Sequence, residues 1–415
     1  MTDRIPLSDD EIEAQKRVPA RALYATYTVG LTTNSLVTMM KVIVPLWAVQ
    51  LGMSPGQIGL AMGAGGLVPF IFSIHGGTMM DRLGTRRITI IFAALGAVTL
   101  LLYPMMPWVA ALFILQMLSG YTTNMGWMGA QALIVQFGRG NTDMIAKFSF
   151  ATRIGTVSGP ILVGAIWDVA GPWGAFSFCA LIGLSIVACT YMVPAKLTDG
   201  ELAEHPTAIR VADFVPRLAD YIQALAMMAI PAVAFVVAVT YIRIASSAMQ
   251  GSFYVVYLEG IGFSGTLIGI LLAMSEGGGM FGSFIAKPME KLMAPHWVLL
   301  IFIALSLFCI AITPYLGGIF VVLLIASAFR GSAQGLAQPV MFAVLSRAVS
   351  RKEQGMSIGL RTTSNRLATM MVPTVMGYIV ELTTIEDSFW IMGAILIGAC
   401  GVIALIIRRL PGFQT

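Results

Sequence analysis

The sequence predicts an all-α membrane protein with twelve transmembrane helices in two pseudo-symmetric six-helix bundles. Three observations support this fold class. The chain of 415 residues is 57% hydrophobic and 11% charged, with a mean hydropathy of +0.85, which is far too apolar for a soluble protein. Its Lys and Arg residues sort into alternate loops, as they do in membrane proteins. Residues in the first half recur at constant offsets in the second, which indicates an internal duplication.

Apolar runs divide the chain into elements that are each close to the length of about 20 residues needed to cross the hydrocarbon core. They cover residues 22–51, 55–79, 87–106, 108–137, 145–169, 173–194, 228–258, 264–287, 295–315, 317–346, 355–381 and 387–408. The polar stretch 196–222 is the expected cytoplasmic linker between an N-terminal bundle, 22–195, and a C-terminal bundle, 223–408. Residues 1–21 and 409–415 are the expected cytoplasmic tails, and the first lacks the apolar core of a signal peptide.

Positive charges define the expected orientation. Outside the apolar runs, Lys and Arg occur in the tails and in every second loop, whereas the loops near Gly52, Gly171 and Glu386 contain none. Because cytoplasmic loops carry the excess of Lys and Arg, both termini are expected in the cytoplasm and the chain in the cell inner (plasma) membrane. The net charge of +5 therefore reports topology rather than a nucleic-acid partner, for which no binding motif is present.

Two series of residues carry the duplication. The first joins the fifth and eleventh spans at an offset of 213 positions: Arg153 and Arg366, Pro160 and Pro373, Gly164 and Gly377, Phe176 and Phe389. The second has an offset of 210 positions: Gly52 and Gly262, Ser54 and Ser264, Ile58 and Ile268, Gly59 and Gly269. Duplicated halves of a membrane protein form a binding site at their interface, near the bilayer midplane.

Motifs for catalysis, metal binding and nucleotide binding are missing. The four cysteines lie in apolar runs without CxxC spacing or a His partner, so neither a metal site nor a disulfide framework is indicated. The sequence contains no GxxxxGK[ST] phosphate loop and no arrangement of a nucleophile with a base. We therefore expect neither an enzyme nor a nucleotide-driven pump, and no cofactor.

The loop between the second and third spans carries a recognisable motif. Residues 77–87 read GTMMDRLGTRR. This loop resembles the GxxxDRxGxRR loop of the major facilitator superfamily, a family of twelve-helix secondary transporters. The glycines permit a tight turn, and the charged side chains can lock neighbouring helix ends at the cytoplasmic face. The resemblance thus implies a conformational gate made of Gly77, Asp81, Arg82, Gly84, Arg86 and Arg87.

The fifth span is similar to a signature of proton-driven drug antiporters in the same family, GxxxGPxxGG. It departs from that signature by reading GPxxxG from Gly159 to Gly164. The same spacing recurs at Pro373 and Gly377, which favours a structural role, since small residues allow helices to approach closely. The subfamily therefore stays open.

In the architecture of this family, spans one, four, seven and ten line a central cavity, with spans two, five, eight and eleven beside it. The resemblance implies that Lys41, Arg243 and Arg330 face the cavity, with Arg153 and Arg366 next to it. Polar and aromatic side chains on the cavity spans can orient a solute: Asn34, Asn124, Trp127, Gln131, Gln250, Tyr254, Tyr257, Gln334 and Gln338. Ordinary packing is an alternative for Trp127, as is an inherited structural contact for the two arginines beside the cavity.

Charges inside a membrane are energetically expensive and mark functional sites. Against these cations stands one carboxylate at depth, Glu276, about twelve residues into its span. Excess positive charge attracts carboxylates, phosphates or sulfates and repels organic cations. Glu276 is the expected group for proton coupling. Alternatively, some cations pair with Glu276 or cap backbone carbonyls, and Arg361 is expected to extend its side chain to the membrane surface.

The leading hypothesis is a secondary active transporter of a small organic anion. We expect proton coupling, alternating access and a monomer that contacts only substrate, protons and lipid. The first alternative is a proton-driven multidrug or metabolite exporter, which the partial motif in the fifth span favours. The second is a non-transporting membrane receptor or assembly factor on a transporter scaffold, for which buried charges have no evident use.

Overall fold

The structure is a computed structural model that describes residues 18–138, 141–198, 222, 225–348 and 354–409. The helices of the first half are α2 (Ala20–Gln50), α3 (Pro55–Leu83), α4 (Thr85–Met105), α5 (Val109–Gly138), α6 (Thr142–Met192) and α7 (Ala195–Thr198). Those of the second half are η2 (Met227–Ala229), α10 (Pro231–Gln250), α11 (Phe253–Gly260), α12 (Gly265–Leu292), α13 (Pro295–Ala311), η3 (Thr313–Leu316), α14 (Phe320–Ala348), α15 (Gln354–Leu382) and α16 (Ile385–Arg409). Most of the expected linker and most of each expected tail lie outside the described residues.

The described regular structure is entirely helical, which confirms the all-α fold class. Eight of the described helices are long and apolar enough to cross a membrane, judged by length and composition. Each of the twelve expected spans is helical in the structure. Helix α6 contains both the fifth and the sixth span, and the seventh span is divided into α10 and α11. The number of crossings stays a prediction.

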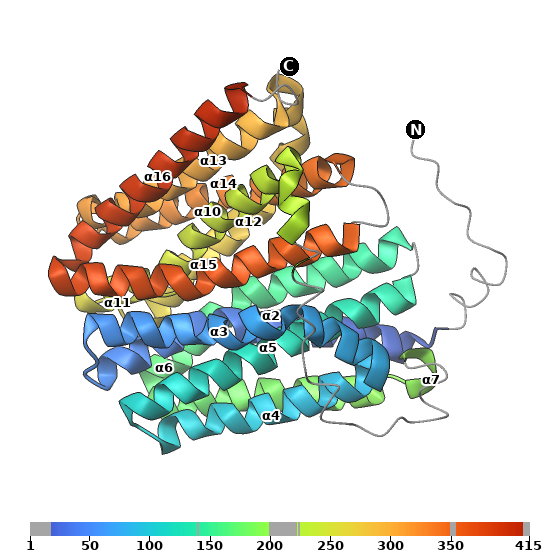
Figure 1. The fold of residues 1–415 in the computed structure, drawn as a ribbon. Coiled ribbons are helices and arrows are strands. Elements are labelled where there is room, and N and C mark those ends of the chain that lie inside the picture. The colour runs from blue at the N-terminus through green and yellow to red at the C-terminus, as the bar shows by residue number, and fades with distance from the viewer. Residues whose placement is uncertain (1–17, 139–140, 199–221, 223–224, 349–353, 410–415) are drawn as a thin grey trace.

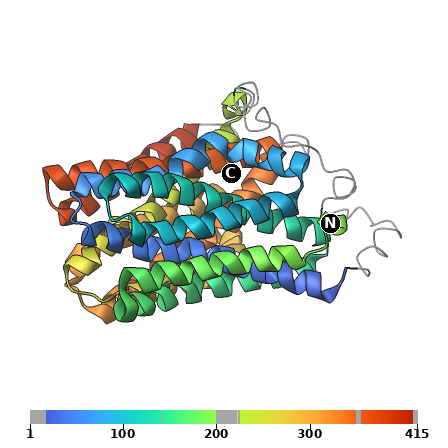
Figure 2. The same cartoon turned by 90° about the horizontal axis from the view of Figure 1, so that it is seen from below.

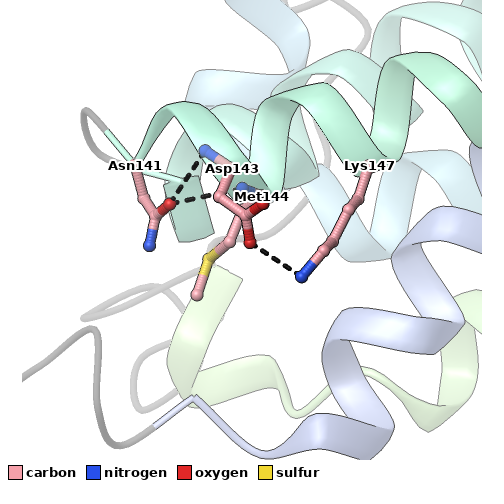
Figure 3. Close-up of polar contacts among 4 residues, drawn as sticks. All are labelled: Asn141, Asp143, Met144 and Lys147. Atoms are coloured by element: carbon pink, nitrogen blue, oxygen red, sulfur yellow. Dashed lines mark hydrogen bonds and ion pairs between the residues drawn. The ribbon is translucent and has the colours of Figure 1, made fainter.

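Helix α6 consists of two arms that meet at a glycine. Gly171 has φ 62° and ψ −162°, a backbone conformation that residues with a Cβ rarely adopt, and Pro172 follows it. The first arm begins at Asn141, whose Oδ1 accepts hydrogen bonds from the backbone N–H groups of Asp143 and Met144 at 3.1 and 3.2 Å (Figure 3). One turn on, Lys147 pairs with Asp143 at 2.7 Å.

The seventh expected span is broken near its middle. Helix α10 ends at Gln250 and α11 begins at Phe253, with Ser252 at φ −135° and ψ −98° between them. A Cβ added at Gly251 would lie 3.2 Å from Cγ of Lys41, so the break packs directly against the lysine stem. Broken helices at membrane depth occur where they line a cavity or are buried in protein.

The helices form two groups that converge toward the left of Figure 1 and spread toward the right. Within the groups, α2 lies along α6, as Figure 2 also shows, and α12 lies along α14. Between the groups, α3 packs on α15 and α6 packs on α12. These two contacts between the halves surround the candidate site.

The contacts between the halves follow the sequence repeat. A Cβ at Gly59 of α3 would collide with the carbonyl oxygen of Pro373 in α15, and a Cβ at Gly269 of α12 would collide with that of Pro160 in α6. The two glycines are 210 positions apart and the two prolines 213. All four lie toward the loops at 51–54 and 261–264, so the halves meet at this end of the bundle, which we call the closed end.

Aromatic packing repeats in the same way. Phe176 and Phe389 are fully buried. Trp47 packs edge-on against Phe176, with ring centroids 6.2 Å apart, and Tyr257 packs edge-on against Phe389 at 6.0 Å. Trp47 and Tyr257 are again 210 positions apart. The duplication therefore determines side-chain contacts as well as helix order.

Two acidic side chains connect the halves at the closed end. Asp168 of α6 accepts hydrogen bonds from the backbone N–H groups of Gly265 and Thr266 at 2.7 and 2.8 Å, and from the Thr266 hydroxyl at 2.5 Å. Glu381 of α15 accepts from the Ser54 hydroxyl at 2.7 Å and from the N–H of Gly56 at 3.0 Å. Each carboxylate thus caps the first turn of the facing helix, a favourable position for negative charge.

Candidate functional site

Two adjoining cavities lie between the halves. The larger one, which we call the Lys41 cavity, has a volume of about 380 Å³, within the range of small-molecule sites. It is lined by Asn34, Val37, Met40, Lys41, Val44, Met62, Gly65, Gln116, Ser119, Gly120, Thr123, Asn124, Trp127, Ile244, Ser247, Ala248, Gly251, Asn365, Arg366, Thr369 and Pro373. Its wall combines two cations, several amides and hydroxyls, and an apolar surface with one Trp.

Polar contacts in the Lys41 cavity join the two halves. The ammonium of Lys41 on α2 lies 3.5 Å from the hydroxyl of Ser247 on α10. The guanidinium of Arg366 on α15 donates a short hydrogen bond to Oδ1 of Asn124 on α5. Neither cation has a carboxylate partner within 4 Å among the described residues. Both cations therefore lack a compensating carboxylate within ion-pair distance in this part of the structure.

The smaller cavity, which we call the Glu276 cavity, has a volume of about 110 Å³. It is lined by Arg153, Arg243, Ser247, Gln250, Ser275, Glu276, Gly279, Gly331, Gln334, Gly335 and Gln338. Every lining residue is polar, charged or glycine. Ser247 lines both cavities, so the two are neighbours along α10.

Glu276 is the negative centre of this group of cations. Its carboxylate acts electrostatically on Lys41, Arg243 and Arg330, and Arg243 is also affected by Arg153. Within the part of the chain that the structure describes, Glu276 makes no direct hydrogen bond or ion pair. A single carboxylate among several cations, without a direct partner, partly compensates their charge.

Four residues predicted for the site lie outside both cavities. Arg330 is 4% exposed and donates to the hydroxyl of Ser275 at 2.6 Å. The Tyr254 hydroxyl pairs with Ser327 at 3.2 Å, and the Tyr257 hydroxyl donates to the carbonyl of Pro314 at 3.4 Å. Gln131 is exposed and lines neither cavity. The remaining predicted substrate residues line one cavity or the other.

The prediction for Arg361 is wrong in this structure. Its side chain is only 9% exposed, and it lies close enough to Arg243 to act on it electrostatically. The expected extension to the membrane surface rested on its position about six residues into its predicted span. The surrounding protein covers most of the side chain instead.

Sequence reasoning missed several polar lining residues, among them Gln116, Ser247 and Asn365. Gln116 accepts a hydrogen bond from the Tyr103 hydroxyl at 2.7 Å. Ser247 lies one helical turn after Arg243, so helical spacing places the two on one face. That spacing is the signal that could have identified Ser247. Asn365 directly precedes Arg366, and adjacent residues on a helix do not share a face, so no spacing rule identifies it.

The loop that resembles the family motif is tied to its own half. Gly84 separates α3 from α4 with φ 93°. Arg86 donates to the carbonyl oxygen of Tyr191 at 2.9 Å, and its guanidinium lies 4.9 Å from the centre of that tyrosine ring. Arg82 and Arg87 are exposed. The side chain of Asp81 lies outside the described residues, so its role as a gate stays a prediction.

Comparisons with known proteins agree on one fold. Residues 26–245 and 233–414 match the sequence profile of the Major Facilitator Superfamily. The crystal structure of the nucleoside transporter NupG has a TM-score of 0.72 at 13% identity, over 93% of this chain and 99% of that chain. A POT family transporter in complex with 5-aminolevulinic acid has a TM-score of 0.72 at 11% identity, over 94% and 96%.

The peptide transporter POT in complex with sulfate has a TM-score of 0.73 at 14% identity, over 98% of this chain and 100% of that chain. No curated protein matches the chain in sequence. At such low identities the solved structures show a common fold and leave the substrate of this chain undetermined.

Proposed function

The chain belongs to the major facilitator superfamily, and we propose that it is a proton-coupled secondary transporter of small organic anions that works by alternating access. The observation that carries this proposal is the charge of the two cavities. Lys41 and Arg366 line one, Arg153 and Arg243 line the other, and Glu276 is the one carboxylate in either lining. Such a site attracts acids and repels organic cations.

The shape of the Lys41 cavity supports an organic solute over a bare inorganic ion. Met40, Met62 and Ile244 add apolar side chains to the lining that contains the cations, and Trp127 adds an aromatic ring. Pockets for small organic molecules typically combine an apolar wall with a few polar groups that fix orientation. The neighbouring nucleoside and peptide transporters show that this fold accommodates solutes of that size.

The proposal is tested by uptake into proteoliposomes that contain the purified chain. A panel of labelled carboxylates, organic phosphates, neutral nucleosides, peptides and lipophilic cations is offered with and without an inward proton gradient. We expect uptake of acids alone, and accumulation only with the gradient. Preferred uptake of lipophilic cations would instead support the multidrug exporter.

The proposed orientation places both termini in the cytoplasm and the closed end outside. In a variant without the four native cysteines, Trp173→Cys and Glu386→Cys should react with an impermeant thiol reagent applied to intact cells, because both residues are exposed at the closed end. Met293→Cys, at the opposite end, should react only after the cells are opened. The reverse pattern would invert the topology.

With that orientation, the two acidic caps join the halves on the outer side of the membrane, and we expect them to hold this side shut. Removing both charges, in the double variant Asp168→Asn and Glu381→Gln, should favour the outward-open state. Contacts of this type contribute about 0.3–1 kcal/mol each, enough to change a balanced equilibrium several-fold. A cysteine at Thr123 in the Lys41 cavity should then be labelled several-fold faster from outside.

The matched control replaces two acids that are exposed at the same end and cap no helix of the other half. Asp387→Asn with Glu386→Gln should leave the labelling rate of the cysteine unchanged. Equal rates in both double variants would show that the caps do not determine which side is open.

A further inference from the structure

We infer that the Glu276 cavity is a second oxyanion subsite, and that the substrate is an organic dianion with one acidic group in each cavity. The inference rests on the proposed function and goes beyond it by specifying the substrate class. The two cavities share Ser247, whose hydroxyl is 3.5 Å from the Lys41 ammonium. A single elongated molecule can therefore reach both.

The lining of the Glu276 cavity is rich in hydrogen-bond donors that lack acceptors. Nε of Arg243, Nε2 of Gln250 and Nε2 of Gln334 are buried and have no hydrogen-bond partner among the described residues. A buried donor without a partner is destabilising, and three around one small space point to an acceptor that arrives with the substrate.

Ser275 adds a further donor. Its oxygen accepts a hydrogen bond from Arg330 at 2.6 Å, which leaves the hydroxyl proton of Ser275 available to the cavity it lines. Arg330 is therefore a positioning residue for this subsite, although it lines neither cavity. This role explains why a buried arginine is placed against a serine rather than a carboxylate.

The two cavities differ in size and polarity, so each suits a different part of the substrate. The Glu276 cavity, at about 110 Å³ and without an apolar lining side chain, accommodates a compact head group such as a carboxylate or a phosphate. The Lys41 cavity, at about 380 Å³ and with apolar walls, accommodates the organic body and the first acidic group. An apolar group in the smaller cavity would leave its donors unpaired.

The charges favour two acidic groups over one. Four cations, Lys41, Arg153, Arg243 and Arg366, line the combined space with the single carboxylate of Glu276. A monoanion leaves one pair of cations without an added counter-charge, whereas a dianion supplies each pair with one. An ammonium group in either cavity would face like charge, so zwitterions and amines are disfavoured.

The test measures binding to the purified full-length chain with matched probes. Hexanedioate carries two carboxylates, its half-amide has the same length with one, and hexanoate has one carboxylate and an apolar end. We expect hexanedioate to bind at least about tenfold more tightly than either monoacid, which is the effect of one charge-assisted hydrogen bond of roughly 1.4 kcal/mol. Phosphorylated carboxylic acids should follow the dicarboxylate and would identify which head group is preferred.

The variants Arg243→Gln and Gln250→Leu should bring the ratio of dianion to monoanion affinity close to one. The matched controls Arg21→Gln and Gln50→Leu alter exposed residues outside both cavities and should retain the ratio. If Arg243→Gln does not elute as a folded protein, Gln250→Leu and Gln334→Leu carry the comparison, and the wild-type panel is informative in every case.

Each outcome is decisive. Equal binding of hexanedioate and hexanoate would overturn the dianion inference and leave anion transport intact. A preference for dianions that survives all three cavity variants would place the second acidic group elsewhere and overturn the subsite. Binding of neutral or cationic solutes instead of acids would overturn the proposed function as well.

Discussion

Replacing Glu276 by Gln is expected to abolish substrate accumulation driven by a pH gradient while sparing exchange of labelled for unlabelled substrate. Glu276 lines its cavity together with Arg153 from α6 and Arg243 from α10. Under the proposed proton coupling, the charged carboxylate would compensate the cations when substrate is absent, and its protonation would let the acidic substrate replace it. Gln resembles the protonated state permanently, so binding continues without proton release.

The measurement compares two assays on the same proteoliposomes. In the first, an inward proton gradient drives uptake, and the Glu276→Gln protein should show none above an empty-vesicle background. In the second, saturating substrate on both sides drives exchange, which should proceed at a rate comparable to that of the wild type. Glu386→Gln, an exposed acid at the closed end, is the control and should behave normally in both. Full accumulation by Glu276→Gln would remove this residue from coupling.

The general architecture could be predicted because the membrane imposes it. Apolar length, loop charge and the two offsets of the repeat each depend on a few residues at a time, and these signals require no knowledge of packing. The repeat even anticipates contacts, since Phe176 and Phe389 are both buried against aromatic partners that are themselves related by duplication. Because many residues contribute to each of these signals, a wrong assignment of one residue leaves the predicted architecture unchanged.

The depth of a residue along its helix was predictable, whereas the direction of its side chain was less so. Lys41, Glu276 and Arg366 line cavities, whereas Arg330 is turned toward Ser275 and away from both cavities. Helical spacing gives the relative faces of residues on one helix. It does not say which of those faces meets a cavity.

The sequence shows that the two acidic caps are related by the duplication, but it does not show what they contact. Asp168 and Glu381 are 213 positions apart, the offset already evident from Pro160 and Pro373. Asp168 lies near the end of the first arm of α6 and is exposed. The two backbone N–H groups that donate to its carboxylate belong to α12, which is far away in sequence. Contacts across the duplicated halves depend on how the bundles pack, which local patterns do not encode.

Replacing Lys41 by Met or Arg366 by Gln is expected to weaken substrate binding by about 2 kcal/mol, roughly thirtyfold in Kd. Each variant removes one charge that lines the Lys41 cavity. The stability of the protein should change much less, since removing a buried cation also removes the penalty of keeping it away from water. Binding to the purified variants and their thermal unfolding give the two quantities.

The variant Arg330→Gln tests whether this buried arginine contributes mainly to substrate binding or to the stability of the fold. Arg330 is as buried as a binding residue, yet it lines neither cavity and donates to Ser275. Its replacement should lower stability by about 1–3 kcal/mol, because Ser275 loses its donor and the space is refilled poorly, and should weaken binding less than the Lys41 and Arg366 variants do. If instead all three variants destabilise the fold and none changes affinity, the buried cations hold the bundle together, and the positive charge of the cavities says nothing about the substrate.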